Sequence, residues 1–156
     1  MKQDIMKMVG VEVNADIVLC TAIDIGEHLL KNGSEISRVE NTIERICFAL
    51  GAAYVEAFAI PSLIAASVRM KDGTYSEQMR HIQSASMNLY RIEKLNTISR
   101  ELCSGEITIS EAREKIEKFK RSFPYKNFVS HIGAFIFVWG FTIVFGGSWS
   151  DAFCGG

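Results

Sequence analysis

The stretch FVSHIGAFIFVWGFTIVF, residues 128–145, contains eighteen consecutive residues without a Lys, Arg, Asp or Glu. As an α-helix it would be about 27 Å long, close to the thickness of the hydrocarbon core of a bilayer. Its aromatic side chains would lie at many angles around the helix axis and leave no polar face for water. The stretch therefore predicts a transmembrane helix. A hydrophobic helix inside a soluble domain is the alternative, because the strictly apolar part, residues 133–145, is short for a membrane span.

The residues after this stretch predict the start of a second membrane segment. Gly146, Gly147 and Ser148 indicate a turn, and Trp149 stands where an interfacial aromatic residue is expected. Asp151 would lie near the start of the next span, where an ionisable side chain either lines a polar cavity or stays at the membrane interface. About eight residues are too few for another crossing. We therefore expect a fragment, or one subunit of a larger membrane assembly.

The charged residues predict which side of the membrane the rest of the chain occupies. All seventeen Lys and Arg lie at or before Lys126, and five of them fall within residues 115–126. Because basic residues beside a span are retained in the cytoplasm, residues 1–127 are expected to form a cytoplasmic domain. Residues 128–156 are expected to contact lipid in the cell (inner) membrane. The net charge of −1 leaves no basic surface for nucleic acid, which is therefore not an expected partner.

The cysteines give no sign of a metal site. Cys20, Cys47, Cys103 and Cys154 are scattered, without CxxC or Cys/His ligand spacing. Reduced thiols are the expected state, with a disulfide or zinc role as the alternative. We expect no metal and no cofactor.

Two helices are predicted at the start of the polar region. Apolar residues recur at helical spacing over residues 16–31, and Asn32 and Gly33 provide a C-terminal stop. A second helix is expected to follow at once, with Ser34 as its N-terminal cap. Its apolar stripe comprises Ile36, Val39, Ile43, Ile46, Cys47 and Leu50.

The composition then changes to that of a small sheet. Residues 54–61 and 62–70 are rich in β-branched and aromatic residues, and Pro61 marks the break between these two predicted strands. Residues 71–73 contain an Asp-Gly turn signal, which predicts a hairpin into a third strand over residues 74–82.

Helical periodicity returns over residues 87–104 and ends at Gly105, and a charged helix follows over residues 110–121 with Ser110 as its cap. Two ion pairs of favourable order are expected on this last helix, Glu111 with Lys115 and Glu114 with Lys118. The predicted order is two helices, a small antiparallel sheet, two helices and the membrane helix. The fold class is therefore α+β.

The second helix has the most unusual composition. Helical geometry places Glu35, Arg38, Thr42 and Arg45 on one polar strip beside the apolar stripe, and Glu40 at the other border of that stripe. Ordinary surface ion pairs are one interpretation, each worth well under about 1 kcal/mol. The other is a surface that recognises carboxylates or organises an interface, because Arg presents a fixed fork of donors.

Four stretches of the chain together resemble the threonine/serine exporter family. They are NGSEISRVENTIERI at residues 32–46, AFAIPSLI at 57–64, RMKDG at 69–73 and FGGSWSDA at 145–152. The resemblance implies a cytoplasmic N-terminal domain followed by a multi-span membrane domain that exports small amino acids. Some relatives divide the membrane part between two polypeptides and are thought to move dicarboxylates such as succinate. The chain departs from the full-length pattern because it ends just after the first predicted span.

The resemblance also implies candidate substrate or interface residues. Carried over from the family motifs are Ser37, Arg38, Glu40, Thr42 and Arg45 on the second helix, Pro61 and Ser62 between the first two strands, and Asp151 after the apolar stretch. Glu35 joins this set from the polar strip. The expected partners are a small amino acid or dicarboxylate substrate and a membrane partner subunit or further copies of the chain.

Two other classes of function stay open. A hydrolase-like domain would need a nucleophile and a base, for which Ser37, Ser62, His28 and His81 are available. The sequence contains no G-x-S-x-G, H-E-x-x-H or Gly-rich phosphate loop, so no catalytic residue is expected. A regulatory or interaction module is the third possibility, because the amphipathic helices over residues 87–104 and 110–121 could pack on a partner subunit.

Overall fold

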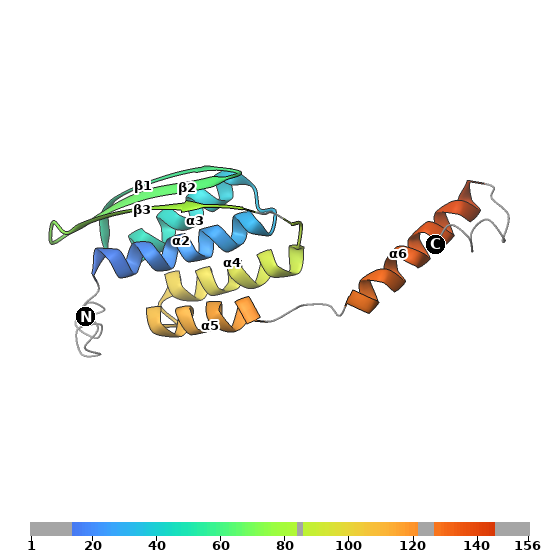
Figure 1. The fold of residues 1–156 in the computed structure, drawn as a ribbon. Coiled ribbons are helices and arrows are strands. Elements are labelled where there is room, and N and C mark those ends of the chain that lie inside the picture. The colour runs from blue at the N-terminus through green and yellow to red at the C-terminus, as the bar shows by residue number, and fades with distance from the viewer. Residues whose placement is uncertain (1–13, 84–85, 122–126, 146–156) are drawn as a thin grey trace. The chain divides into compact units, whose positions relative to one another are not determined.

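A computed structural model of the chain describes residues 14–83, 86–121 and 127–145. The chain divides into two compact units, residues 1–120 and 121–156 (Figure 1). The first unit contains four of the described helices and a three-stranded antiparallel sheet, and the second contains one helix. The predicted α+β class is confirmed, as is the predicted order of two helices, a small antiparallel sheet, two helices and a last helix.

Helix α2 (Ala15–Lys31) is covered on most of its surface. The Asn14 side chain accepts a hydrogen bond from the Asp16 backbone N–H at 3.3 Å and so caps the first turn. Ten of its residues are buried, and they lie on several faces of the helix. This burial arises because α2 packs against the sheet on one side, against α3 beside it, and against α4 on the side away from the sheet (Figure 1).

Helix α3 (Ile36–Ala49) begins one residue later than a Ser34 cap would place it. Glu35 occupies the cap position and its side chain makes no capping hydrogen bond, so the prediction for Ser34 was wrong. The reason lies in the end of α2, where Ser34 N–H donates to the Leu29 carbonyl at 3.0 Å and Gly33 N–H to the Leu30 carbonyl at 3.1 Å. These bonds form a Schellman-type turn, with Gly33 at a φ of 85°.

The apolar stripe predicted on α3 faces the core. Val39, Ile43, Ile46, Cys47 and Leu50 are buried, and Ile36 packs partly buried against them. Helices α2 and α3 approach closely at Gly26, where an added Cβ would lie 2.7 Å from Ile43 Cδ1.

The sheet has the strand order β1-β2-β3. Strands β1 (Ala52–Ile60) and β2 (Leu63–Met70) are joined by a turn at Pro61 and Ser62, as predicted. Strand β3 (Tyr75–His81) follows a tight turn in which Gly73 has a φ of 88°. The inward positions of β1 and β2 are mostly buried against α2 and α3, in keeping with the two-residue alternation of a strand.

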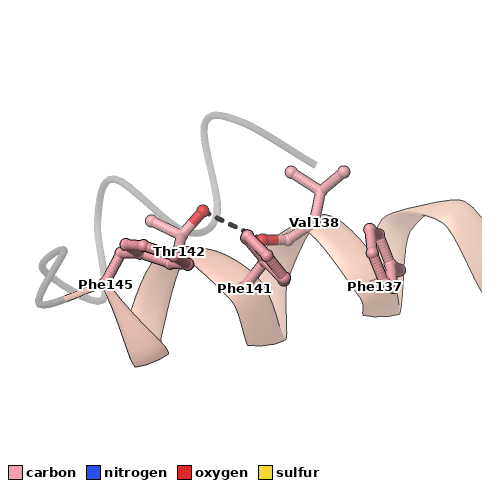
Figure 2. A pocket seen from close by; sticks show the side chains of 5 residues that line it. All are labelled: Phe137, Val138, Phe141, Thr142 and Phe145. Carbon is pink, nitrogen blue, oxygen red and sulfur yellow. Dashed lines mark hydrogen bonds between the residues drawn. The ribbon is translucent and has the colours of Figure 1, made fainter.

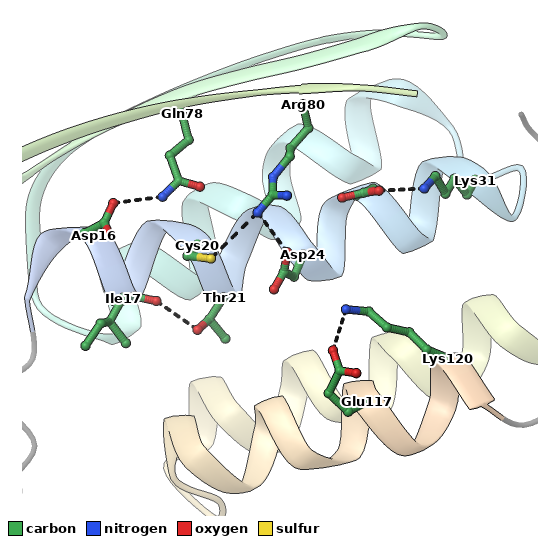
Figure 3. Close-up of polar contacts among 11 residues, drawn as sticks. Asp16, Ile17, Cys20, Thr21, Asp24, Lys31, Gln78, Arg80, Glu117 and Lys120 are labelled. Carbon is green, nitrogen blue, oxygen red and sulfur yellow. Dashed lines mark hydrogen bonds and ion pairs between the residues drawn. The ribbon is translucent and has the colours of Figure 1, made fainter. Parts of the chain in front are cut away.

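Strand β3 is attached to α2 by polar contacts. Its inward side chains are Ser76, Gln78 and Arg80, and no residue of the strand is buried. Gln78 Nε2 donates to Asp16 Oδ1 at 2.9 Å, and Arg80 Nη2 lies 3.3 Å from Asp24 Oδ1 (Figure 3). These contacts replace the apolar burial that holds β1 and β2.

Helices α4 (Leu89–Ser104) and α5 (Ile109–Arg121) form a further layer beneath α2 and α3 (Figure 1). Gly105 ends α4 at a φ of 75°, as the sequence predicts. Thr108, and not the predicted Ser110, caps α5: its N–H donates to Glu111 Oε2 at 2.7 Å, while Glu111 N–H donates to the threonine hydroxyl.

This capping box also changes the predicted ion pairs on α5. The Thr108 N–H and hydroxyl both bind the Glu111 carboxylate and lower its pKa. Lys115 pairs with Glu101 of α4 instead of with Glu111. The predicted pair between Glu114 and Lys118 is present, with 2.7 Å between Nζ and Oε1.

Helix α6 (Asn127–Val144) confirms the helix predicted for the apolar stretch. Most described side chains along it are exposed, and five residues line a shallow apolar groove: Phe137, Val138, Phe141, Thr142 and Phe145 (Figure 2). Among the three described ranges, no helix combines the length and apolar character that a membrane crossing requires.

Candidate functional site

One exposed face of α3 carries two of the predicted arginines. It comprises Ser37, Arg38, Asn41, Arg45 and Phe48, and we name it the α3 strip. Phe48 is 50% exposed although it lies in a helix whose opposite side is buried. No salt bridge within the described residues involves Arg38 or Arg45. Both guanidinium groups are therefore available to an external partner.

Thr42 does not belong to this strip. The residue is 7% exposed, and its hydroxyl donates to the Arg38 carbonyl of the same helix at 2.7 Å. This bond satisfies the hydroxyl locally, so the predicted grouping of Thr42 with the arginines was wrong. Glu35 is exposed at the N-terminal cap position of α3.

Glu40 has a structural contact that the sequence pattern did not reveal. Its Oε1 accepts a hydrogen bond from the Ala59 backbone N–H at 2.8 Å. Strand β1 pairs with β2 on one side and forms the edge of the sheet on the other. The Glu40 carboxylate therefore accepts a hydrogen bond from a backbone N–H that has no partner strand. The bond brings the first turns of α3 beside the end of β1.

The predicted corner residues lie at that end of β1. Pro61 and Ser62 are exposed, and the Ser62 carbonyl accepts a hydrogen bond from Ile82 N–H at 2.8 Å. The structure therefore brings Glu40 and the Pro61–Ser62 turn to the same end of the sheet. Asp151 lies outside the described residues.

The residues considered for catalysis are not arranged as a nucleophile and base. Within the described residues, neither Ser37 nor Ser62 hydrogen-bonds to a histidine. His28 lies in the last turn of α2. It packs edge-on against Phe119 with 5.9 Å between ring centroids, and burial lowers its pKa. His81 ends β3 and is exposed.

The described residues also contain no group of three or more His, Cys, Asp or Glu side chains placed to hold a metal. Cys20, Cys47 and Cys103 are free thiols. Burial raises the pKa of Cys47 to about 12, so this thiol stays protonated at neutral pH.

The outward face of the sheet is a second exposed surface, and no sequence motif marks it as a site. Its strand register places side chains in three neighbouring cross-strand rows that we name the outer sheet face. They are Phe58, Ala65 and Met79; Glu56, Ser67 and Glu77; and Tyr54, Arg69 and Tyr75. A groove of about 480 Å³ runs over the first two rows.

The polar rows of this face are held by short contacts. The Tyr54 hydroxyl donates to Glu56 Oε2 at 3.1 Å, and the Tyr75 hydroxyl donates to Glu77 Oε2 at 3.0 Å. These bonds to carboxylates raise the pKa of both tyrosines. Arg69 lies over the Tyr54 ring, with 5.5 Å from Cζ to the ring centroid. Two acidic groups thus flank Ser67 beside an apolar row.

The two-residue alternation of residues in β1 indicates part of the outer sheet face. Tyr54, Glu56 and Phe58 stand at alternate positions and so share one face of the strand. Which side chains of β2 and β3 complete each row depends on the register, which hairpin geometry sets and composition does not reveal.

Comparison with known proteins gives the family. A family model described as "Putative threonine/serine exporter" matches residues 21–156. Among curated proteins, the chain is 24% identical over 135 residues to a protein of Mycobacterium tuberculosis named "Probable threonine/serine exporter". The match covers 85% of this chain and 25% of the relative, so the chain spans about a quarter of that protein's length. No solved structure matches the chain. The family model covers most of the sequence, and the chain therefore belongs to the threonine/serine exporter family.

Proposed function

We propose that this chain is part of a membrane exporter of small amino acids of the threonine/serine type. The observation that carries the proposal is the family match over residues 21–156, which covers most of the first compact unit and all of the second. Residues 1–127 would form the cytoplasmic domain, and residues 128–156 would contribute the first membrane helix and the beginning of a second segment. Transport, rather than catalysis, is the activity that family membership favours.

The exposed apolar surface of α6 supports a place in the membrane. Ile136, Phe137, Phe141, Val144 and Phe145 are all exposed within the chain. Leaving apolar surface in water is unfavourable by about 25 cal/mol per Å², so these side chains favour lipid or other membrane helices as neighbours. The basic residues that precede α6 favour a cytoplasmic position for the first unit.

The substrate class follows from the family and is a small amino acid. Small dicarboxylates are the alternative substrate. Both carry a carboxylate, the group for which an arginine fork is suited. The exposed Arg38 and Arg45 are the proposed substrate or interface groups on α3, together with the neighbouring Glu35 and Ser37.

Efflux measurements test this role of the α3 strip. Cells that express the chain with its membrane partner would be loaded with labelled threonine, and its release would be followed over time. Arg38→Ala is expected to lower export while the protein stays in the membrane fraction. Arg113→Ala, which removes an exposed arginine from α5, is the matched control and should leave export unchanged. Unaltered export by the Arg38 variant would count against the role of the strip.

A regulatory or interaction module is a second candidate, favoured by the exposed outer sheet face. Co-expression with a second multi-span protein separates the two functions. Efflux that requires both chains supports transport, whereas unchanged efflux with altered assembly of the second protein supports regulation.

A further inference from the structure

We propose that the outer sheet face of one copy of this chain binds the α3 strip of a second copy. Figure 1 shows α2 and α3 packed against one side of the sheet, and the outer sheet face points to the opposite side. Phe58 and Met79 on that face are 58% and 68% exposed. Large apolar side chains gathered on an exposed sheet face are typical of an interaction site.

The charges of the two surfaces are complementary. Glu56 and Glu77 flank Ser67 in one row, and no salt bridge within the described residues involves either carboxylate. Arg45 is likewise exposed and without a salt bridge in that part of the chain. A guanidinium placed between the two carboxylates would form charge-assisted hydrogen bonds, which are stronger than neutral ones.

The distance between the charged and the apolar group is also similar on the two surfaces. Phe48 follows Arg45 by three residues, so on one helix face the two side chains are about 5–6 Å apart. Neighbouring rows on one face of a sheet are about 7 Å apart, because alternate residues share a face. With Arg45 at the glutamate row, Phe48 lies against the row of Phe58 and Met79. Arg38 fits less well, because the residue three positions after it is Asn41.

A second copy is required because the two surfaces cannot meet within one chain. The buried stripe of α3 packs on the inner side of the sheet, so the helix is fixed away from its own outer sheet face. A contact between two different surfaces of identical chains is heterologous and generates a ring or an open array. The two glutamates also disfavour an anionic lipid surface as the occupant of this face.

Cross-linking of the full chain in detergent micelles tests the contact directly. Arg45→Lys keeps the charge and supplies an amine that a zero-length carbodiimide reagent joins to a carboxylate. Mixing ¹⁴N and ¹⁵N copies identifies cross-links between chains. The expected product joins residue 45 of one label to residue 56 or 77 of the other. Self-association without this mixed-label product would overturn the proposal, as would a chain that stays monomeric.

Charge reversal provides an independent test by sedimentation of the same micelles. Arg45→Glu is expected to weaken self-association at least tenfold, by placing like charges together. Glu56→Arg combined with Glu77→Arg should weaken it similarly, and mixing the two variants should restore association. Arg113→Glu on α5 is the matched control and should leave association unchanged. Equal association of the Arg45→Glu variant and the unmodified chain, or failure of the mixture to associate, would overturn the proposal.

Discussion

Replacing Glu40 by alanine should destabilise the first unit through the edge of β1. The carboxylate accepts the Ala59 N–H at 2.8 Å, and Ala59 is 4% exposed. Removing the acceptor leaves a donor on a buried residue without its partner, which costs about 1–3 kcal/mol, and hydrogen bonds to charged groups lie in the upper part of that range. We therefore expect Glu40→Ala to lower the free energy of unfolding by about 2 kcal/mol.

Glu40→Gln is the matched control. Its amide oxygen preserves an acceptor of the same length, so the loss should stay below about 1 kcal/mol. Urea unfolding of the full chain in detergent micelles, followed by circular dichroism, measures both variants. Hydrogen exchange at the Ala59 amide adds a local measurement, and exchange should accelerate in the alanine variant.

Equal unfolding free energies for the two variants would refute this reasoning, as would unchanged exchange at Ala59. The same pair of variants separates structure from function in efflux. If Glu40 acts through the β1 edge, export by the glutamine variant should match that of the unmodified chain. Loss of export with stability retained would assign the carboxylate a direct role.

Two further predictions concern α2. Gly26→Ala places a Cβ 2.7 Å from Ile43 Cδ1, and the overpacking cost of about 1–3 kcal/mol should exceed the helix-propensity gain of about 1 kcal/mol. Urea unfolding should therefore show a lower free energy of unfolding. Gly133→Ala on α6 is the control, because no atom lies within 4 Å of its added Cβ, and it should not destabilise the protein. Burial, the largest cause, lowers the pKa of folded His28, so the unfolded chain binds a proton first as pH falls below about 6.5. The free energy of unfolding should therefore decrease as pH falls below that value, until folded His28 also takes up a proton. His28→Phe should remove this pH dependence. Identical pH profiles of unfolding free energy for the variant and the unmodified chain would contradict the prediction.

The elements themselves were predictable because each carries its own periodicity and stop signal. The stripe of α3, the break at Pro61 and the glycine at the end of α4 all lie where the sequence places them. The caps were not predictable from residue type alone. Ser34 is a good cap residue, yet it still belongs to the turn that closes α2, so the cap position of α3 falls one residue later, at Glu35. Thr108 caps α5 because Glu111 stands three residues later and completes the capping box.

The candidate site was predictable as a position on α3 and not as a set of contacts. Helical spacing correctly separated the exposed Arg38 and Arg45 from the buried stripe. It could not show that Glu40 bonds to a strand nineteen residues away, or that Thr42 turns its hydroxyl back onto its own helix. Both outcomes depend on how α3 packs on its neighbours, which local spacing does not encode.

The polar attachment of β3 has a consequence for how this unit opens. Strands β1 and β2 are retained by buried aliphatic side chains, and added salt does not weaken this apolar burial by charge screening. Beyond its backbone hydrogen bonds to β2, strand β3 relies on contacts of Asp16, Asp24 and Arg80, and the attraction between these charged groups weakens as dissolved ions screen it. The third strand should therefore peel away first under those conditions, leaving a two-stranded ribbon on an intact helical base.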